Sequence, residues 1–417
     1  MIFSENKSEN SLEDLAYKES LDLLEWPSLC NHLSTFASTS QGIKQCQNLS
    51  FPDDINQSNL RIAETIEIAS IDNALDGGLS FRGIYNIDNL LDICDKQGIV
   101  PGEELLQLAE TLATARRLRR QINNLDNCPC IINLLEGLNT FPELEQLIKF
   151  GIEEGGRVAD RASQNLLNLR TRCIEIRKNS KEILQELLRK HESIFQDNVI
   201  SDRNGRPVLS LKSGAIDKLQ GIVHGTSSSG NTIFLEPKEV IYLSNNIASL
   251  ESEISKEELR LLKEWSGVVA LKVDSLKHLS KVLLHLDVAL ARARYGEFLS
   301  GVPPLLCKEP HAEFDLQEFR HPLLIWKEYH QKIGQVVPIT LRVDKNVKVV
   351  AITGPNTGGK TVSLKSIGLA ALMAKAGLFL PCKGQPSLPW CHKILADIGD
   401  EQSIEQSLST FSGHLLR

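Results

Sequence analysis

The feature that most constrains the fold is an apolar run that leads into a glycine-rich loop and then into an apolar helix. Residues 349–353 read as a buried β-strand, the loop has the spacing G-x-x-x-x-G-K-T, and the helix begins near Lys360. This order of strand, loop and helix is what a phosphate-binding loop requires. The sequence therefore predicts a P-loop α/β domain that binds a nucleotide.

Each part of this loop has a physical role in that prediction. Its residues are Gly354, Pro355, Asn356, Thr357, Gly358, Gly359, Lys360 and Thr361. The glycines tolerate the backbone angles that let successive N–H groups surround a phosphate. We expect Lys360 to reach the β- and γ-phosphates of ATP and the Thr361 hydroxyl to ligate Mg²⁺. The first helical turn adds its positive dipole end.

Composition places the chain among helix-rich globular proteins. Hydrophobic residues make up 41% of its 417 residues and aromatic residues only 5%, which fits roughly two to four domains. No apolar run reaches the length of about 18 residues that spans a bilayer, and residues 1–11 do not resemble a signal peptide. The nine cysteines show no metal-ligand spacing. We therefore expect a cytoplasmic protein with reduced cysteines and no membrane partner.

Charge is distributed unevenly along the chain. The net charge is −7, yet residues 157–218 carry 13 Lys and Arg against 8 Asp and Glu. A positive module on an acidic protein is compatible with contacts to nucleic-acid phosphates. A solvated helix face of mixed charge explains the same counts equally well.

The first part of the chain predicts helices without visible chemistry. A polar tail (1–17) precedes a helical core (18–156), whose apolar positions recur at spacings of three and four. Helices are expected at 21–26, 62–75 and 103–122, with glycine and proline in the loops between them. His32 is predicted to be solvent-facing or structural.

Residues 157–300 predict a long helical lever. A narrow apolar seam repeats over about 40 residues, which as a helix spans about 60 Å, and a second seam of the same spacing begins at Val240. The first seam consists of Leu166, Leu169, Cys173, Ile176, Ser180, Ile183, Leu187 and Ile194; the second consists of Val240, Leu243, Ile247, Leu250, Ile254, Leu261 and Val268. Two such helices would pack antiparallel.

A small β-module is predicted between the two lever helices, at about 199–237. Asn204-Gly205 is a strong hairpin signal, and Pro207 cannot donate to a ladder, which predicts that its strand lies at an edge. The candidate nucleic-acid contacts are Arg203, Arg206, Lys212 and Lys218. Because no aromatic platform accompanies them, duplex DNA or structured RNA fits better than single strands. The alternative is that these cations only discourage aggregation at strand edges.

The last segment, 301–417, predicts only the N-terminal part of a P-loop ATPase domain. Strands are expected at 339–343 and 347–353. An ATPase also needs an acidic residue at the end of an apolar strand to hold Mg²⁺. Residues 394–401 do not fit, because Asp397 and Gly399 interrupt the apolar run. No catalytic residue is therefore assignable, and the chain is expected to stop in mid-domain.

At the level of motifs the chain resembles the MutS family. The resemblance rests on the phosphate loop, on Gly377-Leu378-Phe379-Leu380-Pro381-Cys382, on Ala396 through Ile404, on Leu408 through His414, and on the insert 221–237. The motif Gly-Asp-Glu-Gln-Ser-Ile at 399–404 resembles the corresponding motif of the type 2 bacterial branch of this family. The predicted fold is accordingly multidomain and mainly α: a helical core, a long helical lever with a small β clamp tip, and an incomplete P-loop α/β ATPase domain.

The resemblance implies a function and further site residues. Type 2 members form homodimers through their ATPase domains, clamp duplex or branched DNA and suppress recombination, and some split stalled, collided ribosomes through contacts with rRNA. Ser409, Thr410, Phe411 and Ser412 would start a helix that faces the γ-phosphate in the other subunit. Full members are longer and carry a C-terminal Smr nuclease domain, so no residue of this chain is assigned nuclease activity.

Two rival interpretations remain at the level of sequence. The chain could be a truncated fragment that binds nucleic acid or dimerises without hydrolysing ATP, since the acidic strand is expected to be missing. It could also be a P-loop protein of the chromosome-cohesion kind. The short helices and the β-tip weaken that second rival.

Overall fold

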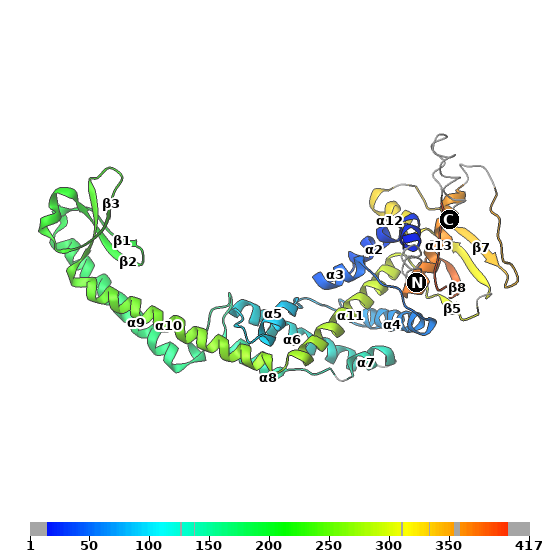
Figure 1. Ribbon diagram of the computed structural model, residues 1–417, viewed down its shortest axis with the longest axis horizontal. Helices are drawn as coiled ribbons and strands as arrows, with labels where there is room; N and C mark the ends of the chain where they lie inside the picture. The colour runs from blue at the N-terminus through cyan, green and yellow to red at the C-terminus, as the bar shows by residue number, and fades with distance from the viewer. Residues whose placement is uncertain are drawn as a thin grey trace, which may run out of the picture. The chain divides into compact units, whose positions relative to one another are not determined.

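The computed structural model describes residues 15–125, 127–136, 138–309, 312–332, 334–353 and 359–398 (Figure 1). It is a helix-rich, multidomain structure with two four-stranded sheets, as the sequence predicts at this coarse level. Two compact units divide the chain: Met1–Asn86, Thr111–Thr140 and Ser275–Arg417 form the first, and Ile87–Glu110 with Phe141–Asp274 form the second. No helix among the described residues is long and apolar enough to cross a bilayer. All nine cysteines lie in the described ranges, and none of them forms a disulfide.

The first unit contains most of the helical core. Its helices are 15–23, α2 (Trp26–Ser34), α3 (Ser40–Gln47), α4 (Ile55–Ala74), α7 (Pro129–Leu135), α12 (Pro322–Gln331) and α13 (Lys360–Ala376), together with parts of α6 (Gly102–Asn123) and α11 (Val273–Phe298). Side-chain caps fix where two of them begin: Thr39 accepts from the Gly42 N–H, and Asp54 accepts from the Gln57 N–H. Of the helices expected from the sequence in this part, 62–75 and 103–122 coincide closely with α4 and α6, whereas 21–26 falls across the turn between helix 15–23 and α2.

A mixed sheet packs with α13 in this unit. Its strands are β5 (Leu305–Cys307), β6 (Phe314–Phe319), β7 (Ile339–Val343) and β8 (Lys383–Pro389), in the order β5-β8-β6-β7. β5 runs parallel to β8, whereas β6 is antiparallel to both β7 and β8. Leu369 and Leu372 of α13 share one apolar core with Leu316 and Phe319 of β6. The core thus holds the helix that follows the phosphate loop.

The strand expected before the phosphate loop is not formed. The expected strand at 339–343 is present as β7, but residues 347–353 have no regular secondary structure, and Val349 is 83% exposed. No described strand pairs with this segment. A strand becomes buried only when neighbouring strands satisfy its backbone and other elements cover both its faces, and the described residues provide neither.

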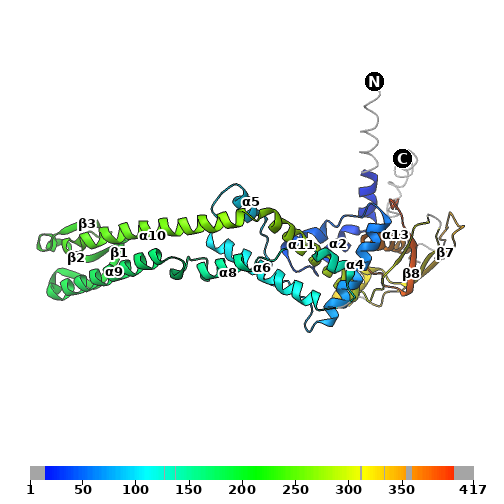
Figure 2. The ribbon, with the colours of Figure 1, turned by 90° about the horizontal axis from the view of Figure 1, so that it is seen from below.

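The second unit is built around a helical hairpin. It contains α5 (Asp88–Asp95), α8 (Pro142–Gly151), η1 (Asp160–Ala162), α9 (Gln164–Lys190) and α10 (Lys238–Ala270). α9 and α10 lie side by side (Figure 2), and Cys173 packs with Ile247 and Leu250 on the predicted seams. α9 is shorter than the 40-residue seam, because Ser163 caps its start and the chain turns into β1 after η2 (Glu192–Ile194).

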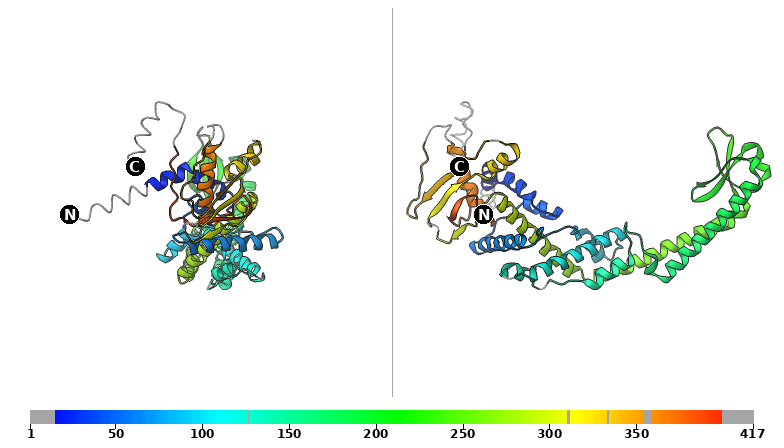
Figure 3. Two further views of the ribbon diagram at one scale, coloured as in Figure 1. Left: turned by 90° about the vertical axis from the view of Figure 1, so that its right-hand side faces the viewer. Right: turned by 180° about the vertical axis from the view of Figure 1, so that it is seen from behind.

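The predicted β-module follows at the end of this hairpin (Figure 3). It contains β1 (Phe195–Arg203), β2 (Arg206–Lys212), η3 (Ser213–Lys218), β3 (Gly221–Thr226) and β4 (Thr232–Pro237), with the sheet order β1-β2-β4-β3. Asn204 and Gly205 have φ of 55° and 77°, the left-handed values of a tight hairpin turn.

The prediction that Pro207 lies in an edge strand is wrong, because β2 lies between β1 and β4. Pro207 is tolerated because β4 pairs with β2 only from Leu209 to Lys212. At Pro207 itself, β1 is the only strand that pairs with β2 among the described residues. The missing N–H therefore costs no ladder hydrogen bond on the β4 side.

Candidate functional site

The amino end of α13 carries the described part of the phosphate loop. Gly359 has φ of +80°, and its carbonyl accepts hydrogen bonds from both the N–H and the hydroxyl of Ser363. Lys360 and Thr361 open the helix, and Thr361 is exposed. The other loop residues, Gly354, Pro355, Asn356, Thr357 and Gly358, lie outside the described residues. Gly359 supplies no side-chain cap to α13, and the amino end of a helix favours an anion.

A pocket of about 370 Å³ lies beside this helix start. Three elements of one unit form it: the first turns of α13, the start of α12, and α2. Its lining residues are Glu25, Ser28, His32, His321, Leu323, Leu324, Lys327, Thr361, Val362 and Lys365. Lys365 forms an ion pair with Glu25 at 3.3 Å. The lining thus combines Thr361 with three apolar side chains, two lysines and one acid.

Two neutral histidines line this pocket. His321 is 5% exposed, and its Nδ1 has no hydrogen-bond partner among the described residues. Burial lowers its pKa to about 4, and the charges of Lys365 and Lys327 act in the same direction. His32 stacks on Trp326 with ring centres 4.1 Å apart, and burial also lowers its pKa to about 4. The sequence prediction for His32 named no pocket, because α12 lies almost 300 residues away in the chain.

The remaining predictions for the ATPase site lie mostly beyond the described residues. Ser409, Thr410, Phe411 and Ser412 fall in 399–417, which the structure does not describe. Within the described ranges, no group of three or more His, Cys, Asp or Glu is placed to hold a metal ion. Thr361, the residue that the sequence proposes for Mg²⁺, is described and is exposed to solvent.

At the β-module, Arg203 makes a contact that the sequence did not predict. Its guanidinium carbon lies 4.1 Å from the centre of the Phe234 ring, a cation–π geometry. Arg203 lies at the hairpin end of β1 and Phe234 on β4, so the pair forms across the sheet. The only signal for it was the alternation of β4, which places Phe234 on the face opposite Ile233 and Leu235.

Arg206 is already engaged inside the module. It pairs with the fully buried Glu236 at 3.1 Å and also donates to the Asn245 side chain. His224 contacts the same carboxylate, with Nε2 and Oε2 separated by 2.7 Å. Burial alone raises the pKa of Glu236, but hydrogen bonds, including those from His224 and Arg206, outweigh it and lower the pKa. Arg206 thus has a structural role whether or not it also contacts a ligand.

The two lysines of the module differ in their contacts. Lys212 donates from Nζ to the Ser193 carbonyl at 2.9 Å. Lys218 is exposed at the end of η3 and has no hydrogen bond or ion pair among the described residues. Of the four predicted contact cations, Lys218 is therefore the one that is not engaged with another described side chain or carbonyl.

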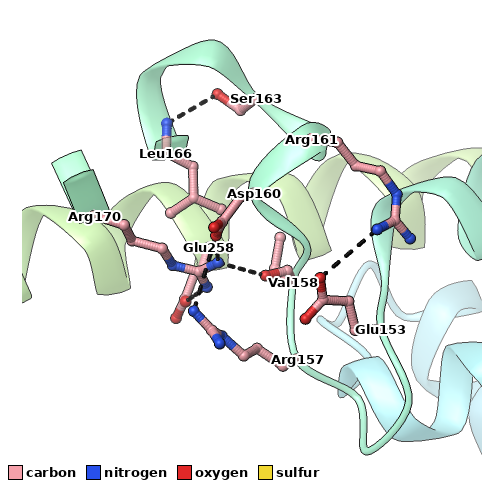
Figure 4. Close-up of polar contacts among 9 residues, drawn as sticks. All are labelled: Glu153, Arg157, Val158, Asp160, Arg161, Ser163, Leu166, Arg170 and Glu258. Carbon is pink, nitrogen blue, oxygen red and sulfur yellow. Dashed lines mark hydrogen bonds and ion pairs between the residues drawn. The ribbon is translucent and has the colours of Figure 1, made fainter. Parts of the chain in front are cut away.

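A buried ion-pair network holds the base of the hairpin (Figure 4). Arg170 of α9 is 7% exposed and pairs with Asp160 and with Glu258 of α10. It also donates to the Val158 carbonyl at 2.8 Å. Burial lowers the pKa of its guanidinium, but the hydrogen bonds to the two acids outweigh that effect and raise it. Arg170 thereby ties η1, α9 and α10 together where the two long helices begin to run side by side.

Comparison with known proteins identifies proteins that are similar to this chain in sequence. The family model described as MutS domain V matches residues 350–416. The protein named Endonuclease MutS2 of Synechocystis is 42% identical over 401 residues, which is 96% of this chain and 49% of that protein. Proteins of the same name from Pelotomaculum thermopropionicum and Clostridium botulinum are 35% and 33% identical over 95% of the chain. The chain spans about half the length of these curated relatives.

Proposed function

Because the chain belongs to the MutS family, in the branch of the relatives named Endonuclease MutS2, we propose that it forms the ATP-binding and nucleic-acid-gripping part of a homodimeric clamp. The observation that carries the proposal is the start of α13. Gly359, Lys360 and Thr361 open this helix in a chain that also holds a long helical hairpin with a β-module at its end. Nucleotide binding at α13 would open or close two such hairpins around nucleic acid.

At the nucleotide site, each described residue has a defined role. Lys360 would bind the β- and γ-phosphates, and the first N–H groups of α13 would face the same anion. The Thr361 hydroxyl would ligate Mg²⁺, which neutralises phosphate charge when it is bound. The loop residues Gly354 to Gly358 and the trans role of Ser409 to Ser412 remain predictions of the sequence. We assign no catalytic residue.

At the β-module, a duplex would contact the cations of the hairpin turn and η3. Lys218 can take up a phosphate without breaking a described contact. Arg203, whose guanidinium lies over the Phe234 ring, can donate to a second phosphate through its N–H groups. Duplex or branched DNA is the proposed target, in connection with suppression of recombination. Ribosomal RNA on stalled, collided ribosomes is the second candidate, because phosphate contacts do not distinguish the two.

The nucleotide half of the proposal is tested with Lys360→Ala. This variant should bind ATP at least tenfold more weakly, because a charge-assisted contact to the phosphates is lost. Lys308→Ala, at an exposed lysine after β5, is the matched control and should bind as the unsubstituted chain does. Titration of both with a fluorescent ATP analogue makes the measurement. Equal affinities in the two variants would refute the assignment of Lys360.

The nucleic-acid half is tested by charge reversal at the β-module. Lys212→Glu with Lys218→Glu should weaken duplex binding and reduce the salt slope by about two, one for each phosphate contact. Arg206 is left intact, because Glu236 depends on it. The control reverses Lys256 and Lys263, which lie on α10 about 27 Å or more from its start. An unchanged slope would return Lys212 and Lys218 to the role of discouraging strand-edge aggregation.

The rival function is a binding or dimerising module that does not turn over ATP. Its support is that the acidic strand expected in an ATPase falls on no described residue. Phosphate release by the purified chain, with and without Mg²⁺, separates the two. Mg²⁺-dependent turnover that Lys360→Ala abolishes would exclude the rival, and ATP binding without turnover would favour it for this chain.

A further inference from the structure

A second polar cavity lies in the first unit, on residues other than those of the phosphate loop. It has a volume of about 200 Å³ and is formed by the end of α3, the segment after it, α4 and α11. Its lining residues are Gln45, Leu49, Ser50, Arg61, Lys281, Leu284, His285, Val288 and Arg292. Three of these are arginine or lysine and none is acidic, so the lining alone carries a charge of +3 before His285 is counted.

The deepest of these cations is Arg292 on α11. It is 2% exposed, and its Nη2 donates to the Glu64 carboxylate at 3.1 Å. Glu64 is itself buried on α4, and the same carboxylate oxygen contacts His285 Nε2 at 2.9 Å. One carboxylate is therefore shared between a guanidinium and an imidazole.

The hydrogen bonds of Arg292 are incomplete. Its Nε is buried and has no partner among the described residues. Burial lowers the pKa of the guanidinium to about 10, and the positive charge of Arg61 acts in the same direction, while Glu64 opposes both. A buried donor without a partner and two guanidiniums that repel each other both raise the free energy of the empty pocket.

Other carboxylates near the pocket do not compensate for this charge. Asp53 attracts Arg61, but it is exposed to solvent, where screening weakens the attraction. Asp287 lies on α11 and is fully buried, but its two oxygens accept hydrogen bonds from the backbone N–H groups of Ser38 and Thr39 and from the Thr39 hydroxyl. Both oxygens of Asp287 are thus already hydrogen-bonded at the start of α3.

We propose that the cavity between α4 and α11 binds a phosphate group, either free or as part of a small phosphorylated metabolite. Arg61, Lys281 and Arg292 supply the charge, and Ser50 and Gln45 add polar side chains at the rim. Arginine provides planar, directional donors and lysine a point charge, a combination that suits a tetrahedral oxyanion. The apolar wall of Leu49, Leu284 and Val288 lowers the local dielectric constant, which strengthens each of these attractions.

The volume is consistent with that ligand. A water molecule takes up about 30 Å³ in the liquid, so a cavity of about 200 Å³ has room for one phosphate group with a few waters. The site shares no lining residue with the phosphate loop. It therefore remains available when the nucleotide site at α13 is occupied or disabled.

The test separates this pocket from the phosphate loop by using Lys360→Ala as the background. Inorganic phosphate is titrated by calorimetry into that variant and into the same variant with Lys281→Met. Lys281 is exposed, so its replacement leaves the core intact. We expect phosphate to bind the background protein and Lys281→Met to weaken it about tenfold, the effect of one charge-assisted contact. Lys44→Met, an exposed lysine of α3 outside the lining, should leave the affinity unchanged.

Two outcomes of the phosphate titration would overturn the proposal. One is loss of all phosphate binding in the Lys360→Ala background, and the other is equal weakening by Lys281→Met and Lys44→Met. As an independent readout, phosphate should perturb the NMR signals of the His285 ring in the background protein, and the absence of any perturbation would also refute the site. AMP titrated in parallel distinguishes the two sources: tighter binding than inorganic phosphate indicates an esterified ligand, and equal or weaker binding indicates the free ion.

Discussion

Two buried arginines, one in each unit, differ in how completely neighbouring residues balance their charge and satisfy their hydrogen bonds. Arg170 at the base of the helical hairpin has two carboxylates and a carbonyl for one guanidinium. Arg292 in the first unit shares one carboxylate with His285, and its Nε has no partner in the part of the chain that the structure describes. Both side chains are almost fully buried. The first network has its charges balanced by its own residues, and the second does not.

The difference separates a structural contact from a candidate ligand site. A buried charge is stable only when its hydrogen bonds and its countercharge are supplied. At Arg170 the protein supplies both, so the network fixes η1, α9 and α10 to one another and needs no ligand. At Arg292 one hydrogen bond and part of the countercharge are missing, and a cavity adjoins the guanidinium. The missing partner is what we propose the phosphate provides.

The largest expected effect is that of removing the balanced arginine. Arg170→Met should lower the free energy of unfolding of the hairpin unit by about 3 kcal/mol, because Asp160 and Glu258 lose their shared partner. The figure is at the low end for buried pairs, since both carboxylates are partly exposed. Urea denaturation followed by circular dichroism measures it. A loss below about 1 kcal/mol would show that the network does not hold the hairpin.

The next effect is on pH dependence and concerns a buried group that stays neutral. The pKa of His321 is lowered to about 4 by burial, against about 6.5 when unfolded. Below pH 6.5 the unfolded state binds a proton that the folded state does not, so stability falls as the pH drops from about 6.5 to 4. Between pH 7 and pH 5 the loss from this group is about 2 kcal/mol. His321→Gln should remove this contribution to the pH dependence of stability, and the contribution of His32, whose pKa is also lowered to about 4, should remain. If stability changes with pH to the same extent in the variant and in the unsubstituted protein, the assignment to His321 is contradicted.

A smaller effect is expected from removing the single acid at Arg292. Glu64→Gln should cost about 1 to 2 kcal/mol, because the amide still accepts a hydrogen bond but no longer balances the charge. Burial raises the pKa of Glu64, but its bonds to His285 and Arg292 outweigh this and lower it. Its stabilisation is therefore present above about pH 4.3 and is lost as the pH falls through the lowered value.

The same variant sharpens the comparison between the two arginines. Glu64→Gln should bind phosphate more tightly, since the carboxylate that competes for Arg292 behind the pocket lining is removed. Asp53→Asn, at an exposed carboxylate, is the control and should change both stability and affinity less. Weaker phosphate binding in Glu64→Gln would mean that Glu64 orients the cations rather than competing with the ligand.

The smallest effect on stability is expected at an ion pair that, like that of Arg170, joins α9 to α10 but is exposed to solvent. Arg177 also lies on α9 and pairs with Glu251 of α10, but both side chains are about half exposed. Arg177→Met should change the free energy of unfolding by less than about 0.5 kcal/mol. Urea denaturation beside Arg170→Met makes the comparison direct. Similar losses in the two variants would show that burial does not set the strength of these pairs.

Much of the fold was predictable because its signals are local. The two apolar seams predicted α9 and α10, and Asn204-Gly205 predicted the hairpin of the β-module. The helix after the phosphate loop followed from its apolar residues. Each of these depends on spacing along one segment, which the sequence displays in full.

The candidate site was predictable only in part. Lys360 and Thr361 were found from the motif and do open α13. The prediction of a strand at 347–353 is wrong, because the burial of a strand depends on neighbouring strands that a motif does not specify. The sequence predicted that Pro207 lies in an edge strand, because a proline cannot donate to a ladder on either side of a fully paired strand. In the structure β4 pairs with only part of β2 and leaves Pro207 out.

By itself the sequence determined the two long helices α9 and α10, the turn of the β-module, the start of α13 and the family, since each is encoded in the spacing of neighbouring residues. Lys281, His285 and Arg292 even share helical spacing on α11, a signal for one basic face. Only the tertiary structure decided which charges are balanced. Asp160 and Glu258 reach Arg170 from two other elements. Among the described carboxylates, Glu64 is the one that pairs with Arg292, across more than 200 residues of chain. Countercharge acts through space, and spacing along the chain does not fix distance in the folded protein.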